Sequence, residues 1–184
     1  MTPAPIEHYA LFETAIGTCG VAWSERGLTR LQLPESDRQA TEGRLRKAAA
    51  AGAAKPPARI EAIVKEVQRY LTGEKIAFTA AVLDLADVTP FDRLVYQATR
   101  ALGWGKTASY GEIGQRIGAP EAARAVGQAL SRNPIPIIIP CHRVLASGHR
   151  IGGFSAYGGA STKERLLELE GVGLRVSAPM LPGI

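Results

Sequence analysis

The sequence predicts an α/β protein in two parts, with a small antiparallel sheet and helices over residues 1–88 and a mainly helical domain over residues 89–184. Apolar and polar residues alternate along residues 9–33, which is the period of half-buried strands. Two short amphipathic segments within residues 109–132 are separated by a Gly-Ala turn, as in a helix-turn-helix. Charge divides at the same place, because residues 89–184 carry 11 Lys and Arg against 6 Asp and Glu, whereas residues 1–88 carry 11 of each.

The elements of the first half follow from local patterns. The alternating stretch breaks at Gly17 and at Ser-Glu-Arg-Gly, which indicates short strands joined by turns. Residues 37–53 are rich in Ala, Arg and Glu and predict a helix, and residues 58–73 predict a second one that ends at Gly73. Its apolar face consists of Ile60, Ile63, Val64, Val67 and Leu71. Cys19 lies inside a strand, where we expect a small buried hydrophobic residue.

The second half opens with a helix that Thr89 can cap and in which Pro90 takes the first position. Its predicted buried stripe is Phe91, Leu94, Val95, Ala98 and Leu102. The helix-turn-helix then begins after Ser109, and Pro120 is predicted to open its second helix, which runs to about residue 132.

A final helix is predicted over the stretch STKERLLELEG. Ser161 is its expected cap, with Glu164 at capping-box spacing, and Gly171 ends it. On this pattern alone, Glu170 is a surface charge at the end of a helix.

The composition excludes several classes of protein. The 184 residues are 46% hydrophobic and 21% charged, which is ordinary for a globular domain with a real core. No run approaches the roughly 18 apolar residues of a membrane span, and the first residues lack the basic start and apolar stretch of a signal peptide. We therefore expect a cytoplasmic protein with no membrane partner. Cys19 and Cys141 are far apart and outside any CxxC spacing, which offers no zinc-ligand pattern and leaves one long-range disulfide as the alternative to free thiols. In a reducing compartment both are expected to be free thiols.

Residues 134–144, PIPIIIPCHRV, carry the clearest chemical signal. Their three prolines donate no backbone hydrogen bond and favour extended geometry in the residues before them, which predicts a rigid, buried, extended rod. It delivers Cys141 beside His142, and a nearby imidazole favours the nucleophilic thiolate. Consecutive side chains of an extended chain leave on opposite sides, so a bridging water or a local turn is required. Alternatively, Cys141 is a buried structural cysteine.

The predicted second helix of the helix-turn-helix is unusual for its small residues. One long cation, Arg124, stands among Ala122, Ala123, Ala125, Gly127 and Ala129. Such a helix can approach another surface closely, and the basic half of the chain is the candidate for a polyanionic partner. Alternatively, the alanines pack against a neighbouring helix and Arg124 is a solvated charge.

These residues together resemble the O6-alkylguanine-DNA alkyltransferase family, also called methylated-DNA-protein-cysteine methyltransferases. The resemblance covers residues 89–171 and joins Arg-Ala-Val-Gly, Asn-Pro and Pro-Cys-His-Arg-Val at the spacing of the family. Residues 1–88 match only in the order of elements and in the strand pair AWSERGLTRLQL. The resemblance implies an N-terminal α/β domain over 1–88 and a winged-helix-like DNA-binding and alkyltransferase domain over 89–184.

The resemblance also implies a reaction. Members flip an O6-alkylated guanine out of the duplex and transfer the alkyl group to a cysteine that is never regenerated, so each molecule acts once. By this resemblance Cys141 is the nucleophile, His142 is a base acting through a water, and Glu170 orients the histidine. Asn133 ties the helix-turn-helix to the cysteine segment. No cofactor is implied, and activity on O4-alkylthymine is left open.

The same resemblance assigns residues to DNA. Arg124 matches the arginine that replaces the extruded nucleotide in the base stack, and Ala123, Ala125 and Gly127 match the small residues of a helix in the minor groove, which is roughly 6 Å wide. Tyr110 matches a tyrosine near the phosphate and the flipped guanine, where its hydroxyl assists departure of the base; alternatively, Tyr110 is a half-buried core aromatic. The implied partner is double-stranded DNA containing O6-alkylguanine, and the protein is expected to be a monomer.

The loop after the cysteine departs from the family. Residues 145–164 are about two residues longer than the commonest version, so the pocket is not aligned uniquely. Either Phe154 with Ser155 or Ala156 with Tyr157 supplies its aromatic wall and backbone donor, and Val144 is expected beside them. His149, also in this loop, is expected at the surface.

Other classes of function remain open on the residues alone. A thiol hydrolase would share Cys141 and His142 but would turn over. A helix-turn-helix regulator would read the major groove through polar side chains that EAARAVGQAL mostly lacks. A lesion sensor without repair activity would be expected to lack the cysteine.

Overall fold

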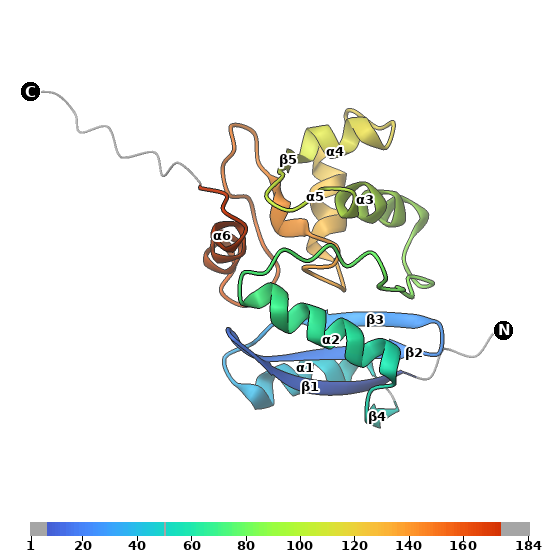
Figure 1. Ribbon diagram of the computed structural model, residues 1–184. Helices are drawn as coiled ribbons and strands as arrows, with labels where there is room; N and C mark the ends of the chain where they lie inside the picture. The colour runs from blue at the N-terminus through green and yellow to red at the C-terminus, as the bar shows by residue number, and fades with distance from the viewer. Residues whose placement is uncertain (1–6, 50, 174–184) are drawn as a thin grey trace, which may run out of the picture.

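The structure is a computed structural model that describes residues 7–49 and 51–173. A four-stranded sheet and two helices form the first half, and a helical domain lies beside them (Figure 1). The fold class predicted from the sequence, an α/β protein with a small sheet followed by a helical domain, is confirmed. Within the described ranges, no helix is both long and apolar enough to cross a membrane.

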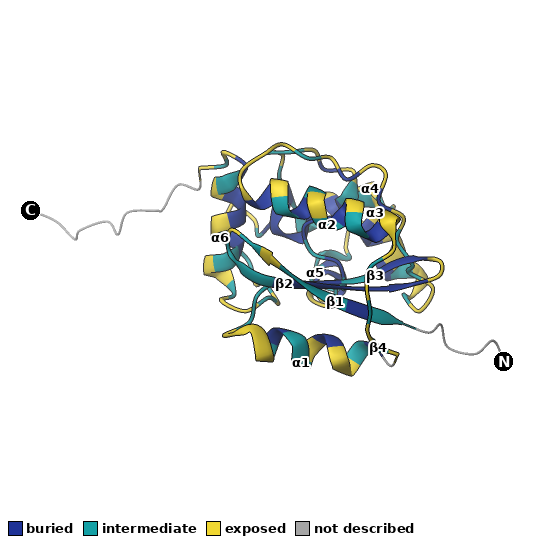
Figure 2. Ribbon diagram, turned by 60° about the horizontal axis from the view of Figure 1, so that its bottom comes forward, coloured by how far each residue is buried: buried dark blue, intermediate teal, exposed yellow. Residues whose placement is uncertain are grey.

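The sheet has the order β3-β2-β1-β4, in which β4 pairs parallel to β1 and the other pairs are antiparallel. Its strands are β1 (His8–Thr14), β2 (Gly17–Ser24), β3 (Gly27–Gln32) and β4 (Gly52–Ala53). Helices α1 (Arg38–Ala48) and α2 (Ala58–Leu71) cover opposite faces of this sheet (Figure 2). The alternation along β2 explains this, because Val21 packs in the main core whereas Ala22 packs with Leu45 of α1. Cys19 is fully buried, as predicted.

The helix predicted over residues 37–53 is shorter than expected. It ends at Ala48, and the chain then forms β4 on the open edge of β1. Ala54 donates its backbone N–H to the carbonyl of Tyr9 at 2.9 Å. Pairing with an unsatisfied strand edge has replaced the last turn of the helix, which local composition cannot reveal.

The second half contains the helix-turn-helix. Its elements are α3 (Pro90–Arg100), β5 (Ala108–Ser109), α4 (Tyr110–Arg116), α5 (Ala123–Ser131), the 3-10 turn η1 (Cys141–Arg143), β6 (Val144–Leu145) and α6 (Ala160–Leu169). Thr89 caps α3, and Ser109 with Glu112 forms a capping box on α4. Strands β5 and β6 pair in parallel beside the helices.

Three predictions for this half were wrong: the buried face of α3 and the first residues of α5 and α6. Leu94 is 49% exposed, because α3 packs through Val95 and Tyr96, a face rotated by about one residue. Residues 119–122 form a turn instead of the start of a helix, so α5 begins at Ala123 and Pro120 precedes it. Helix α6 begins after Gly159, with no side-chain cap from Ser161.

The two halves share one core. Buried residues from the sheet and α2 form a single cluster with those of α3, α5 and the isoleucines before Cys141. A backbone hydrogen bond from Leu31 of β3 to the carbonyl of Pro134, at 3.0 Å, joins the sheet to this segment. The cysteine segment is therefore held between the two halves.

Candidate active site

The segment before Cys141 is buried, as predicted, but it is not an extended rod. Ile135, Ile137 and Ile139 are at most 1% exposed, and the amide of Ile139 donates to the carbonyl of Ile135 at 2.9 Å, which closes a turn. Ile137 adopts a positive φ of 71°, a conformation that a β-branched residue reaches only when its surroundings enforce it. The apolar side chains thus anchor a compact turn.

Asn133 holds this turn from the end of α5. Its side-chain amide donates to the carbonyl of Ile139 at 2.8 Å, and its carbonyl oxygen accepts from the amide of Ile135 at 3.0 Å. The side chain therefore replaces the backbone partners that the prolines of this segment do not offer. It links the helix-turn-helix to the residues just before Cys141.

Cys141 opens the 3-10 turn η1 and faces a cavity of about 400 Å³. The cavity is lined by Tyr110, Gly127, Leu130, Ser131, Cys141, Gly153, Phe154 and Ser155. Burial raises the pKa of the Cys141 thiol, so the resting cysteine is protonated at neutral pH. A nucleophilic role therefore needs a group that takes the proton.

The pocket residues predicted from the loop are placed in two groups. Phe154 and Ser155 line the cavity, in keeping with the first of the two alternatives. Val144 and Tyr157 are not among its lining residues: Val144 is fully buried in β6, and Tyr157 is 56% exposed. Ala156 borders a neighbouring groove of about 230 Å³ that shares Phe154 with the cavity.

His142, the residue after Cys141, forms a buried pair with Glu170. The imidazole Nε2 lies 2.8 Å from Oε1 of the carboxylate, and neither side chain is exposed. Burial lowers the pKa of His142, so the ring is neutral at rest. Its other nitrogen, Nδ1, is buried and makes no hydrogen bond to any residue in the described part of the chain. That atom is free to accept a proton.

Glu170 receives more hydrogen bonds than the sequence suggested. Burial alone would raise its pKa, but hydrogen bonds from His142 and Arg143 outweigh burial and hold the pKa well below its usual range. The amide of Gly105 donates to Oε2 at 3.1 Å, and the hydroxyl of Tyr70 donates to Oε1 at 2.5 Å. Glu170 is therefore a fixed, buried anion and not a surface charge.

Sequence reasoning missed Arg143 and Tyr70. Arg143 is 6% exposed; its Nε donates to Glu170 at 2.9 Å and its Nη1 donates to the carbonyl of Leu102. The sequence signal for Arg143 was its position directly after His142, because a carboxylate that is buried beside the histidine needs a cation as a partner. Tyr70 lies on the buried face of α2 beside Leu71, and the predicted apolar face of this helix did not include it.

Lys163 was missed as well. It is 1% exposed and donates from Nζ to the carbonyl of Val144 at 2.6 Å, while Nζ lies 5.7 Å from the centroid of the Tyr110 ring. Burial lowers its pKa to about 8, and the nearby Cys141 acts in the opposite direction. The signal was its spacing, because a lysine three and four residues before Leu166 and Leu167 falls on the inward face of α6.

Helix α5 borders the cavity and continues out to the surface. Gly127 and Ser131 line the cavity, and Arg124 lies one turn earlier on the same side of the helix and is exposed. Ala123 and Ala125 are only partly buried, so the alanines do not all pack into the core. Tyr110, at the start of α4, is half-buried and lies against the cavity.

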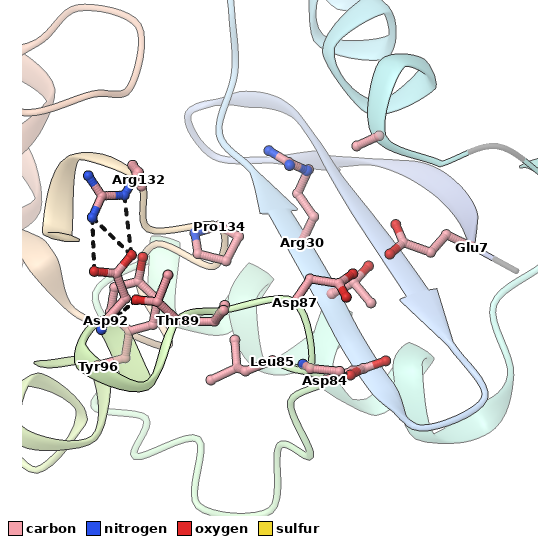
Figure 3. Close-up of a pocket in the computed structure, with 14 residues that line it drawn as sticks. Glu7, Arg30, Asp84, Leu85, Asp87, Thr89, Asp92, Tyr96, Arg132 and Pro134 are labelled. Carbon is pink, nitrogen blue, oxygen red and sulfur yellow. Dashed lines mark hydrogen bonds and ion pairs between the residues drawn. The ribbon is translucent and has the colours of Figure 1, made fainter. Parts of the chain in front are cut away.

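A second cavity, of about 410 Å³, lies between the sheet and the start of α3 (Figure 3). Arg132 and Asp92 form a bidentate ion pair at its edge, with Nη2 to Oδ1 at 2.9 Å. Arg30 and Asp84 face it from the first half. It contains neither Cys141 nor His142, so it is separate from the candidate active site. Within the described residues, no cluster of three or more His, Cys, Asp or Glu side chains is arranged to hold a metal ion.

Comparison with known families matches most of the chain. Residues 8–85 match the family described as 6-O-methylguanine DNA methyltransferase, ribonuclease-like domain, and residues 90–172 match 6-O-methylguanine DNA methyltransferase, DNA binding domain.

Individual proteins and a solved structure are also similar to the chain. The chain is 34% identical over 155 residues to the methylated-DNA–protein-cysteine methyltransferase of Methanothermobacter thermautotrophicus, covering 84% of this chain and 80% of that protein. It is 34% identical over 173 residues to the protein of the same name from Methanosarcina acetivorans, covering 89% and 98%. The crystal structure of Mycobacterium tuberculosis OGT in complex with DNA is similar with a TM-score of 0.72 and 37% identity, covering 89% of this chain and 92% of that one.

Proposed function

Because the chain belongs to the 6-O-methylguanine DNA methyltransferase family, we propose that it repairs O6-alkylguanine in double-stranded DNA by direct reversal. It acts as a methylated-DNA–protein-cysteine methyltransferase that moves the alkyl group to one of its own cysteines. The observation that carries this proposal is Cys141 at the cavity, followed in the chain by His142, which forms a buried pair with Glu170.

Cys141 is the acceptor in this proposal. Its sulfur attacks the carbon bound to O6, the new S–C bond forms as the C–O6 bond breaks, and the electron pair leaves with the guanine oxygen. The thioether that results has no proton to lose and no leaving group that water can displace readily. Each molecule therefore accepts one alkyl group and then stops.

The proton of the thiol goes to His142. Nε2 is engaged with Glu170, which leaves Nδ1 as the basic atom, and a water between Nδ1 and the sulfur would carry the proton. The ionised Glu170 then stabilises the imidazolium. Asn133 keeps the cysteine turn in place, and the hydroxyl of Tyr110 assists departure of the guanine from the cavity.

Helix α5 is the proposed DNA element. Its small residues, Ala123, Ala125 and Gly127, allow close approach to the minor groove, and the exposed Arg124 fills the stack where the guanine was. Phe154 and Ser155 close the pocket around the flipped base. Phosphate contacts by the basic half, residues 89–184, predict that duplex binding weakens as salt rises.

The remaining parts of the proposal concern organisation. We divide the chain into an N-terminal α/β domain over residues 1–88 and a DNA-binding and alkyltransferase domain over residues 89–184. The protein is proposed to act as a cytoplasmic monomer. Transfer from O4-alkylthymine is a second substrate to be tested in the same assay.

Mass spectrometry tests the proposal directly. After incubation with an excess of duplex containing O6-methylguanine, the peptide that contains Cys141 should gain one methyl group, and transfer should stop at one equivalent per protein. Cys141→Ala should abolish transfer and retain binding to the lesion duplex, whereas Cys19→Ala should transfer normally. Continued turnover, or methylation of another residue, would contradict the proposal.

A further inference from the structure

Tyr70 is a buried tyrosine from the first half of the chain that reaches the His142–Glu170 pair. It lies on the last turn of α2, where that helix ends next to α6 (Figure 1). Its hydroxyl donates to Oε1 of Glu170 at 2.5 Å and lies 3.1 Å from Nε2 of His142, and its side chain is fully buried. The three polar groups form a closed triangle across 100 residues of sequence.

Packing fixes this hydroxyl in place. The ring of Tyr70 lies 5.4 Å from Trp104 in an edge-on arrangement and 5.7 Å from Phe78. Burial and the neighbouring Glu170 raise the pKa of Tyr70, so the phenol stays protonated over the working pH range. A neutral phenol held in this way offers one donor and two acceptor lone pairs at a fixed point.

The assignment of protons in the triangle follows from charge. Glu170 is ionised and can only accept, so the hydroxyl proton of Tyr70 is directed to Oε1. The lone pairs of the phenol oxygen then face Nε2–H of His142, which is shared between the phenol and the carboxylate. When His142 takes the proton of Cys141 on Nδ1, both acceptors stabilise the imidazolium.

We propose that Tyr70 is a positioning residue for the alkyl transfer, through which the N-terminal half of the chain stabilises the protonated His142 that activation of Cys141 requires. This inference rests on the proposed function. It assigns to α2 a part in the chemistry in addition to its part in the core. The hydroxyl is the group that acts, because the ring alone would serve packing.

The test compares the pH dependence of thiolate formation in matched variants. Alkylation of Cys141 by iodoacetamide is followed by mass spectrometry, which reports the thiolate without requiring DNA or an alkylated guanine. Tyr70→Phe keeps the ring contacts and removes the hydroxyl. Loss of one hydrogen bond to a charged group should shift the apparent midpoint of the Cys141–His142 pair upward by about one pH unit. Reaction with free O6-benzylguanine at neutral pH should slow by about tenfold.

Two controls separate this role from structure. Tyr96→Phe removes another buried tyrosine hydroxyl, which donates to the carbonyl of Ala129 and lies outside the triangle, so its midpoint should equal that of the wild type. Phe78→Leu loosens the packing of the Tyr70 ring and leaves the hydroxyl, so it should lower the unfolding midpoint in urea without moving the pH midpoint.

Each outcome is decisive. An unchanged pH midpoint in Tyr70→Phe, or an equal shift in Tyr96→Phe, would overturn the inference. If Tyr70→Phe does not fold, the wild type still provides a test, because the Tyr70 hydroxyl proton should give a slowly exchanging NMR resonance close to the His142 ring, and its absence would count against the role. A wild type that does not accept methyl from duplex O6-methylguanine, while the midpoints differ as expected, would overturn the proposed function and leave the role of Tyr70 at His142 intact.

Discussion

Nε2 of His142 lies 2.8 Å from Oε1 of Glu170, and both side chains are completely shielded from solvent. This contact fixes the tautomer of the ring, because a carboxylate accepts only and Nε2 must therefore carry the proton. The second nitrogen, Nδ1, is left as the basic atom of the site. The contact thus determines which atom of His142 faces the chemistry.

His142→Ala should slow transfer from both duplex O6-methylguanine and free O6-benzylguanine. The loss should be about 100-fold or more, which is typical when a general base is removed. Single-turnover rates on the two substrates measure it. His149→Ala is the matched control, since that histidine is exposed, and its rates should equal those of the wild type. A normal rate with the free base in His142→Ala would show that another group takes the proton.

Arg124→Ala should affect the two substrates differently. A free base needs no extrusion from the stack, so reaction with O6-benzylguanine should be unchanged, whereas repair of duplex should slow by at least tenfold because unstacking is worth a few kcal/mol. Arg46→Ala removes one exposed cation from α1 and controls for the change in net charge. Equal slowing of both substrates would mean that Arg124 acts on the cavity or on folding, and α5 would lose its assignment to the minor groove.

Substitution by alanine at two glycines of α4 should change the stability of the protein in opposite directions. A Cβ on Gly114 would lie 2.7 Å from the backbone carbonyl oxygen of Ala119, so Gly114→Ala should destabilise the protein by about 1–3 kcal/mol through overpacking. A Cβ on Gly111 meets only the Ser109 hydroxyl at 3.8 Å, so Gly111→Ala should stabilise by up to about 1 kcal/mol. Urea unfolding of both variants measures this. Equal stability of the two would mean that α4 does not pack tightly on the turn at Ala119.

Lys163 should make stability depend on pH in the alkaline range. Its folded pKa of about 8 lies below the unfolded value of about 10.4, so the unfolded state binds more protons between these values and stability rises with pH across that window. The gain contributed by Lys163 is on the order of 3 kcal/mol. Lys163→Met removes the titrating group and should lack this rise. Unfolding free energies measured from pH 7 to 10 compare the two proteins, and parallel curves would contradict the assignment.

Some of this architecture could be predicted from short segments. The alternation along residues 9–33 identified the first three strands, and the capping signals at Thr89 and Ser109 identified the starts of α3 and α4. These features depend on neighbours within a few residues, where dihedral preferences and side-chain caps act. The predicted end of α1 and the predicted buried face of α3 were wrong, because a strand edge determines the first and packing against a neighbouring helix determines the second.

The residues of the candidate site were likewise predicted only in part. The family resemblance placed Cys141, His142 and Glu170 in one hypothesis, and the fold brings the last two into contact. Arg143, Lys163 and Tyr70 were not predicted, since a position beside His142 or on the inward face of a helix does not show which partner a buried polar side chain meets. Only the surrounding packing decides whether such a side chain meets a partner or water.

The sequence by itself determined the order of the first three strands and the helices, the basic second half, and a cysteine and histidine that follow a proline-rich apolar segment. The tertiary structure alone decided that this segment closes into a turn and that Tyr70 completes the pair of His142 and Glu170. The physical reason is distance along the chain. Local dihedral preferences and caps act over a few residues, whereas a hydrogen bond between residues 100 positions apart exists only after α2 and α6 have packed into the common core.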